Sequence, residues 1–127
     1  MAEANMKETY IIPSDSGLGE IGVGYEVVAV IAGIAATETD GVASMAGGIT
    51  ADLVGKLGMS TLSKGVKVEV SEKNVLVELS LNIQRGYSMK EVCEDVQDKV
   101  KVAIENMTGL NVVRVNIKVA GVEAVAR

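Results

Sequence analysis

Apolar and polar residues alternate along three segments in the second half of the chain, and each segment is predicted to be a β-strand. The strands cover 65–71, 74–83 and 110–120, and the segment Ser71–Asn74 reads as a hairpin loop between the first two. The positions predicted to face a core are Val66, Val68, Val70, Val75, Val77, Leu79, Leu81, Ile83, Val113, Val115, Ile117 and Val119. Lysine, arginine, glutamate and small polar residues occupy the alternate positions, so the sheet should have one apolar and one polar face.

The segment 88–107 changes to helical periodicity. Its apolar residues recur at spacings of three and four and form one stripe, made of Met89, Val92, Cys93, Val96, Val100, Ala103, Ile104 and Met107. Ser88 and Glu91 have the spacing of a capping box, and Gly109 is suited to a left-handed stop. Asp95 with Lys99, and Lys101 with Glu105, are expected to pair along the helix.

A second helix is predicted over residues 25–38, and it carries two stripes. Val27, Val30, Ile31 and Ile34 are bulky and are expected to pack on the sheet. Ala29, Ala32, Gly33 and Ala36 form a stripe of small residues, which lets another backbone approach closely. The neighbour could be the other helix of the same chain, or a partner or second copy of the protein.

The remaining segments complete an α+β prediction. Residues 1–18 are expected to be a flexible N-terminal arm, followed by a domain over 19–122 and a tail over 123–127. Short strands are expected at 20–23 and 41–45. The segment 46–64 should be a loop with one helical turn near Ala51–Leu57. The predicted fold is a two-layer sandwich, in which a mixed sheet of three to five strands carries two main helices on one face.

The other face of that sheet would be uncovered in a monomer. The candidate interaction surface therefore combines the small-residue stripe with five charged residues of the polar face. These are Lys67, Glu69, Glu78, Arg114 and Lys118.

Composition limits the chemistry that such a domain could perform. The 127 residues include no histidine and one cysteine, Cys93, and carry a net charge of −5. Without histidine the commonest general base and the commonest metal ligand are missing, and one cysteine allows no intrachain disulfide. Eight acidic and two basic residues give residues 1–60 a charge of −6, whereas residues 61–127 carry +1. We expect no catalytic residues, no cofactor and no metal site.

Three patterns resemble binding motifs. Gly17–Gly22 matches G-x-G-x-x-G but lacks the strand and acidic residue of a dinucleotide site, so linker glycines explain it better. Gly55–Gly58 has the GXXG form of a KH loop, which keeps a KH-like RNA-binding module open as an alternative. An acidic chain is, however, a poor general binder of nucleic acid. The acids of segment 88–107 alternate with lysines, as on a solvated helix face. The longest apolar run, Val27 to Ala36, is half the roughly 20 residues that a membrane span needs.

An ordered set of segments resembles the bacterial alkaline-shock protein family, also described as envelope stress response proteins. The segments are Gly19–Val23, Glu26–Ala36, Asp40–Gly48, Lys64–Val70 and Val100–Gly121, the last including Glu105-Asn-Met-Thr-Gly-Leu110. The resemblance covers about residues 19–122.

This resemblance implies a non-enzymatic cytoplasmic protein linked to cell-envelope homeostasis. It also implies self-association into homo-oligomers and peripheral membrane association through a membrane-embedded anchor protein. The expected function is that of a structural or adaptor protein with no membrane span of its own.

Overall fold

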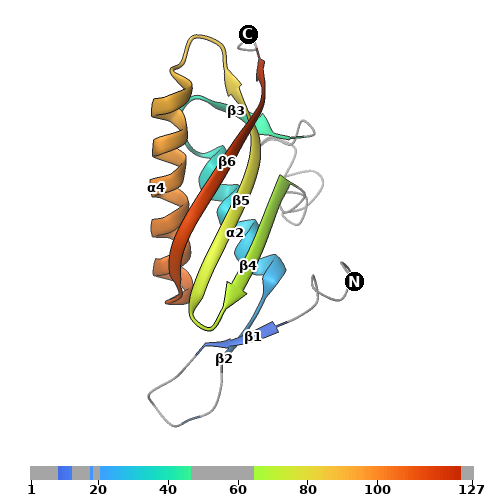
Figure 1. Ribbon diagram of the computed structural model, residues 1–127, viewed down its shortest axis with the longest axis vertical. Helices are drawn as coiled ribbons and strands as arrows, with labels where there is room; N and C mark the ends of the chain where they lie inside the picture. Colours follow the sequence, from blue (N-terminus) through green and yellow to red (C-terminus); the bar gives the residue numbers. More distant parts are fainter. Residues whose placement is uncertain (1–8, 13–17, 19–20, 47–64, 124–127) are drawn as a thin grey trace.

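The computed structural model describes residues 9–12, 18, 21–46 and 65–123. Figure 1 shows a sheet with one helix behind it, a second helix alongside it at the left, and a separate pair of short strands at one end. The elements are β1 (Thr9–Ile12), β2 (Ile21–Gly24), α2 (Tyr25–Thr37), β3 (Val42–Met45), β4 (Val66–Ser71), β5 (Asn74–Gln84), α4 (Met89–Thr108) and β6 (Asn111–Glu123). Each strand and helix predicted from the sequence within the described residues is present, with ends shifted by at most three residues.

The main sheet is built around β5. Strand β6 runs parallel to β5 along one side, with Asn74 opposite Asn111 and Gln84 opposite Glu123. Two antiparallel strands share the other side, because β4 pairs with the first half of β5 and β3 with its last residues. The sheet is therefore mixed, as predicted. The β4–β5 hairpin turns at Glu72 and Lys73, and Glu72 adopts a φ of 58°, which is uncommon outside glycine.

Both helices cover the same face of the sheet, which confirms the two-layer α+β fold. Helix α2 packs on β3 and β4, α4 packs on β6, and the helices pack on each other. The core between the layers consists of aliphatic side chains. The fully buried ones include Val28, Met45, Val75, Val77, Leu79, Leu81, Ile83, Val96, Val100 and Ile104.

Helix α4 begins and ends as its sequence predicts. The Ser88 hydroxyl accepts a hydrogen bond from the Glu91 amide at 3.4 Å, and Gly109 ends the helix with a φ of 78°. Met89 and Met107, predicted to lie in the buried stripe, are instead 48% and 72% exposed. Both lie in the terminal turns of the helix.

The ion pairs of α4 differ in part from those expected. Lys101 pairs with Glu105 at 2.8 Å, as predicted. The second ion pair among the described residues joins Lys90 and Glu94 at 3.1 Å, instead of Asp95 and Lys99. The Lys90–Glu94 pair is largely exposed, so solvent and salt leave it little weight in stability.

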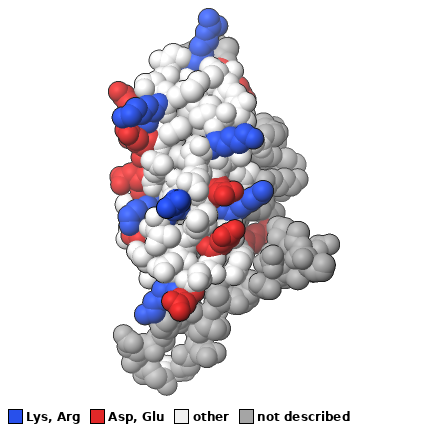
Figure 2. Space-filling model, in the orientation of Figure 1, with Lys and Arg blue, Asp and Glu red and all other residues white. Residues whose placement is uncertain are grey.

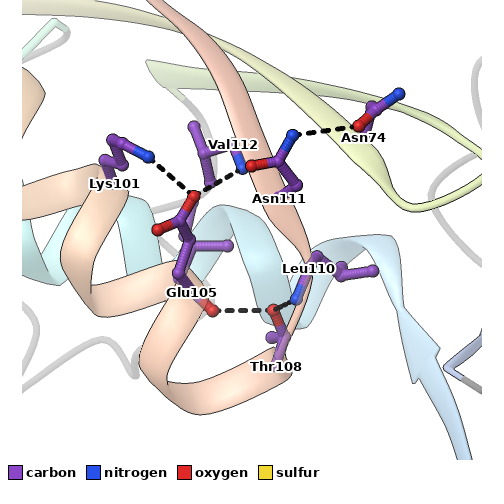
Figure 3. A network of polar contacts seen from close by, with 8 residues as sticks. Asn74, Lys101, Glu105, Thr108, Leu110, Asn111 and Val112 are labelled. Carbon is purple, nitrogen blue, oxygen red and sulfur yellow. Dashed lines mark hydrogen bonds and ion pairs between the residues drawn. The ribbon is translucent and has the colours of Figure 1, made fainter.

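A polar network ties the end of α4 to the start of β6 (Figure 3). One carboxylate oxygen of Glu105 accepts from Lys101 Nζ at 2.8 Å and from the Val112 amide at 3.0 Å. These two donors hold the pKa of Glu105 below its usual range, the lysine contributing most. The Thr108 hydroxyl donates to the Ile104 carbonyl and accepts from the Leu110 amide. The turn from helix to strand is thus fixed by side chains as well as by Gly109.

Strand β6 departs from simple alternation at two bulges. Val112 pairs with Val75 and Arg114 with Leu76, so Val113 is an extra residue. Val113 was predicted to face the core and is instead 56% exposed, whereas Val112 is buried. Ala120 is a second extra residue, between the pairs formed by Val119 and Gly121.

The prediction that the bulky stripe of helix α2 packs on the sheet is wrong, because only Ile31 of its four residues is buried. Val27 is 52% exposed, and Val30 and Ile34 are half-buried. The face against the core is instead led by Val28 and Ile31 together with alanines. Small side chains fit there because α2 has both the sheet and α4 as close neighbours.

Strand β1 lies within the segment expected to be a flexible arm. Thr9–Ile12 pairs in antiparallel fashion with Ile21–Gly24, and together they form a two-stranded sheet separate from the main one. The run Tyr10-Ile11-Ile12 has high strand preference, and it is the signal in the sequence that indicates this strand. The helical turn expected near Ala51–Leu57 falls outside the described residues.

Candidate interaction surface

The face of the main sheet that points away from the helices carries the five charged residues singled out in the sequence. Lys67, Glu69, Glu78, Arg114 and Lys118 are all exposed there. Figure 2 views this face and shows basic and acidic groups interspersed with uncharged surface over the sheet. We call these five residues and the neutral side chains between them the open face.

The strand register arranges the open face in rows. One row runs Glu69, Leu76, Arg114 across β4, β5 and β6. Neighbouring strands lie about 4.8 Å apart, so the acidic and basic ends of this row are about 10 Å apart at the backbone. Leu76 lies between them, half-buried, at a position where alternation otherwise places polar residues.

A second row runs Lys67, Glu78, Asn116, and in the next row Ser80 lies opposite Lys118. Both ion pairs found among the described residues lie on α4, so none joins two charges of the open face. These charged groups keep their capacity to bind groups from outside the chain.

The second and third rows border a shallow hollow of about 460 Å³. Small residues leave this space open on the β4 side, because Ala46 and Gly65 flank Ser80 there. The described residues that line it are Ala46, Gly65, Lys67, Glu78, Leu79, Ser80, Asn116, Ile117 and Lys118. Two ammonium groups, one carboxylate, one hydroxyl and one amide can make salt bridges and hydrogen bonds with a polar side chain of either charge.

Beyond this hollow, a hydrogen-bonded cluster of side chains lies at the end of the open face. No sequence pattern indicated this cluster. Ser44, only 1% exposed, accepts from Asn82 Nδ2 at 2.9 Å and donates to Glu123 Oε2 at 3.1 Å. The cluster links β3, β5 and β6. It holds β3 against the centre of the sheet at the point where β4 has ended.

The small-residue stripe of α2 has a different location. Ala29, Ala32, Gly33 and Ala36 are all buried, and Ala32 and Ala36 have no exposed surface. They are packed within the chain and offer no free surface for a second protein in this conformation. The open face and the stripe are therefore not one surface.

The other candidate features from the sequence are Cys93, the metal-ligating residue types, the two glycine motifs and a membrane span. Cys93 is half-buried, and burial raises the pKa of its thiol, which disfavours the reactive thiolate. Within the described parts of the chain, no three residues of the metal-ligating types are close enough to hold an ion. Gly55–Gly58 lies outside the described residues, as do Gly17 and Gly19 of the other glycine motif. None of the described helices is long and apolar enough to cross a membrane.

Comparison with known proteins identifies the family. A family model matches residues 14–124, and it describes the alkaline shock protein 23 family, with a cell envelope-related function. No solved structure matches significantly.

Three relatives resemble the chain over most of its length. The uncharacterized protein YqhY of Bacillus subtilis (strain 168) is 35% identical over 109 residues, which are 86% of this chain and 81% of that protein. YloU of the same strain, also uncharacterized, is 34% identical over 106 residues, or 82% and 88% of the two chains. A stress response regulator gls24 homolog of Streptococcus pyogenes serotype M3 is 30% identical over 124 residues, or 93% and 69%. The chain therefore belongs to the alkaline-shock protein family that its sequence resembles, whose function is related to the cell envelope.

Proposed function

We propose that this protein is a non-enzymatic structural or adaptor protein of the envelope stress response, which acts by self-association and by docking on a membrane-anchored partner. The observation that carries the proposal is the open face, with five exposed charges and no ion pair among them on a rigid sheet. A family with an envelope-related function supplies the setting for such a surface.

The physical form of this face suits binding better than chemistry. Three hydrogen-bonded strands fix the backbone positions of its charged groups, so a partner would meet a preset pattern of charges and would have to order only the side chains. Interspersed charges of both signs give specificity for a surface with the matching pattern, because mismatched like charges are strongly unfavourable. The acidic chain and its lack of a basic block give the RNA-binding alternative no comparable support.

The proposal is tested with a photo-reactive amino acid placed at single positions in cells of the native host. At Lys118 on the open face, the probe should form crosslinks to a second copy and to proteins of the membrane fraction. At Lys99, an exposed residue of α4, it should not. The adduct pattern should change when the charges of the open face are reversed.

The same experiment can refute the proposal. Equal crosslinking from Lys118 and Lys99, or none from either, would show that the open face has no preferred partner. A purified protein that remains monomeric at millimolar concentration in sedimentation would remove the self-association part.

A further inference from the structure

The first row of the open face has a symmetry that points to one particular partner. Glu69 and Arg114 lie at opposite ends of this row, with Leu76 at its centre. A twofold axis along β5, between two sheets stacked face to face, reverses the row in the second copy. Arg114 of each copy then meets Glu69 of the other, and the two Leu76 side chains meet at the axis.

We propose that the open face is a self-complementary interface, on which a second copy of this chain stacks about a twofold axis parallel to β5. The inference rests on the proposed self-association and specifies its geometry. Two interchain Arg–Glu pairs surround a Leu76–Leu76 contact, which gives the interface a small apolar centre with charge pairs on both sides. Stacking of two sheets at nearly aligned strand directions is an ordinary packing mode.

The other rows are compatible with the same axis. In the second row Glu78 meets its symmetry mate, but each carries Lys67 of its own chain on the neighbouring strand. Two lysines therefore balance the two glutamates at this point. Asn116 faces Lys67 of the other copy and can accept a hydrogen bond from it.

The third row accounts for the hollow. The axis brings Lys118 of one copy over the β4 side of the other, where Gly65 and Ala46 leave space beside Ser80. A lysine side chain fits into this space and reaches the carboxylate of Glu78, which lines the same hollow. The hollow of each copy thus receives one long basic side chain from its mate.

One alternative axis fits less well. A twofold axis that runs across the strands and is centred on Glu78 would bring Arg114 of one copy onto Lys118 of the other, because these residues lie on β6 at equal distances from the row of Glu78. That arrangement would also oppose Glu78 and Lys67 with their own symmetry mates, whereas among the charged residues the axis along β5 opposes only the two Glu78 side chains. Like charges placed opposite each other are costly, so the axis with fewer such contacts is favoured. The charge pattern of the open face therefore favours the axis along β5.

Charge reversal tests this geometry with four samples. Arg114→Glu alone sets glutamate against Glu69, and Glu69→Arg alone sets arginine against Arg114, twice per dimer in each case. Each single variant should raise the dissociation constant of the dimer by about 10- to 100-fold. An equimolar mixture of the two variants should recover a heterodimer, because one chain then carries glutamate and the other arginine at both ends of the row, so both interchain pairs are of opposite sign. The double variant should recover a homodimer, because exchanging the two charges restores an opposite-sign pair at both ends of the row.

The measurement is sedimentation equilibrium over a concentration series, with fluorescent labelling of one variant for the mixture. Lys99→Glu and Asp95→Lys make similar charge changes on the exposed surface of α4 and should leave association unchanged. Thermal unfolding of each variant checks that the fold is kept, which is expected because both substituted side chains are exposed.

The outcomes separate this inference from the broader proposal. A wild-type protein that associates while both single reversals leave it unaffected overturns the face-to-face interface and keeps self-association. Weakened single variants whose double variant does not recover show that the face binds something other than its own twofold mate, which also overturns the inference. A wild-type monomer overturns this inference and the self-association part of the proposed function, and leaves docking on another protein to the crosslinking experiment.

Discussion

Gly41 is the residue at which a single added methyl group should damage the fold most specifically. It lies in the turn between α2 and β3, with a φ of 96°, and its carbonyl accepts from the Gln84 amide at 2.7 Å. A β-carbon built there would lie 2.5 Å from Val92 Cγ2 and 2.8 Å from Tyr87 Cδ2. The turn cannot move aside freely, because the hydrogen bond to Gln84 holds it against β5.

Gly86 provides a matched control. Its φ is 98°, almost the same as that of Gly41, but nothing lies within 4 Å of its added β-carbon. Gly86→Ala should therefore cost only the backbone term, about 1 kcal/mol for a left-handed alanine, partly offset by the lower entropy of the unfolded chain. Gly41→Ala adds overpacking, which typically costs about 1–3 kcal/mol.

The difference between the two variants isolates the packing term. We expect Gly41→Ala to be less stable than Gly86→Ala by about 2 kcal/mol, or roughly 8 °C in melting temperature for a domain of this size. Urea titration and thermal unfolding measure both quantities. Adding Val92→Ala to each variant should reduce the loss in free energy of unfolding that Gly41→Ala causes, and should leave the loss caused by Gly86→Ala unchanged. Equal losses at the two glycines would refute the argument from crowding.

The described contacts support three further predictions. Glu105→Gln should lower the urea midpoint at pH 7, whereas Glu94→Gln, in an exposed pair, should change it little. Because the pKa of Glu105 is depressed, its contribution to the free energy of unfolding is fully present above the unfolded pKa of about 4.3 and is lost as pH falls through the folded value. The stability difference between the wild-type protein and Glu105→Gln should therefore shrink in acid. Val113→Ser should change stability by about 0.5 kcal/mol or less, but Val115→Ser, at a position 8% exposed, by about 2 kcal/mol; equal effects would contradict the bulge. Gly33→Leu should destabilise the buried side of α2 by about 1–3 kcal/mol in chemical denaturation, and a fully stable variant would show that the helix has free space there.

The sequence predicted most of the fold because periodicity is a local property. Strand β5 and helix α4 each bury one regular set of positions, and their patterns specify both the element and its inner face. The cap at Ser88 and the stop at Gly109 are equally local, since the interacting groups are at most four residues apart in the chain. Such features need no knowledge of the tertiary structure.

Features that depend on distant segments could not be predicted in this way. The pattern of α2 does not reveal that its close neighbours bury the small residues more fully than the bulky stripe, so the small residues also suited a free surface. Leu76 gave a readable signal, as an apolar residue among polar ones, but its place between Glu69 and Arg114 depends on the pairing of three strands. Ser44 and Glu123 are 79 residues apart and meet only when β3 and β6 flank β5.

The two bulges of β6 have the largest effect on the open face. Asn111 pairs with Asn74 and shares its polar face, since their side chains are hydrogen-bonded at 3.1 Å. Strict alternation from Asn111 would turn Arg114 toward the helices, and the extra residue Val113 instead brings it outward beside Leu76. Glu105 supports this bulge, because its carboxylate binds the Val112 amide just before it.

The second bulge acts in the same way at the other end of the strand. Without Ala120 as an extra residue, Glu123 would point toward the helices and could not accept from Ser44 on the open face. The charges that a partner would meet are therefore set by irregularities of the strand and not by its alternation. A shift of one residue at either bulge would exchange polar for apolar groups across part of the face. The register of β6, fixed by Glu105 at one end and by the Ser44 cluster at the other, is thus the structural condition for any binding by this surface.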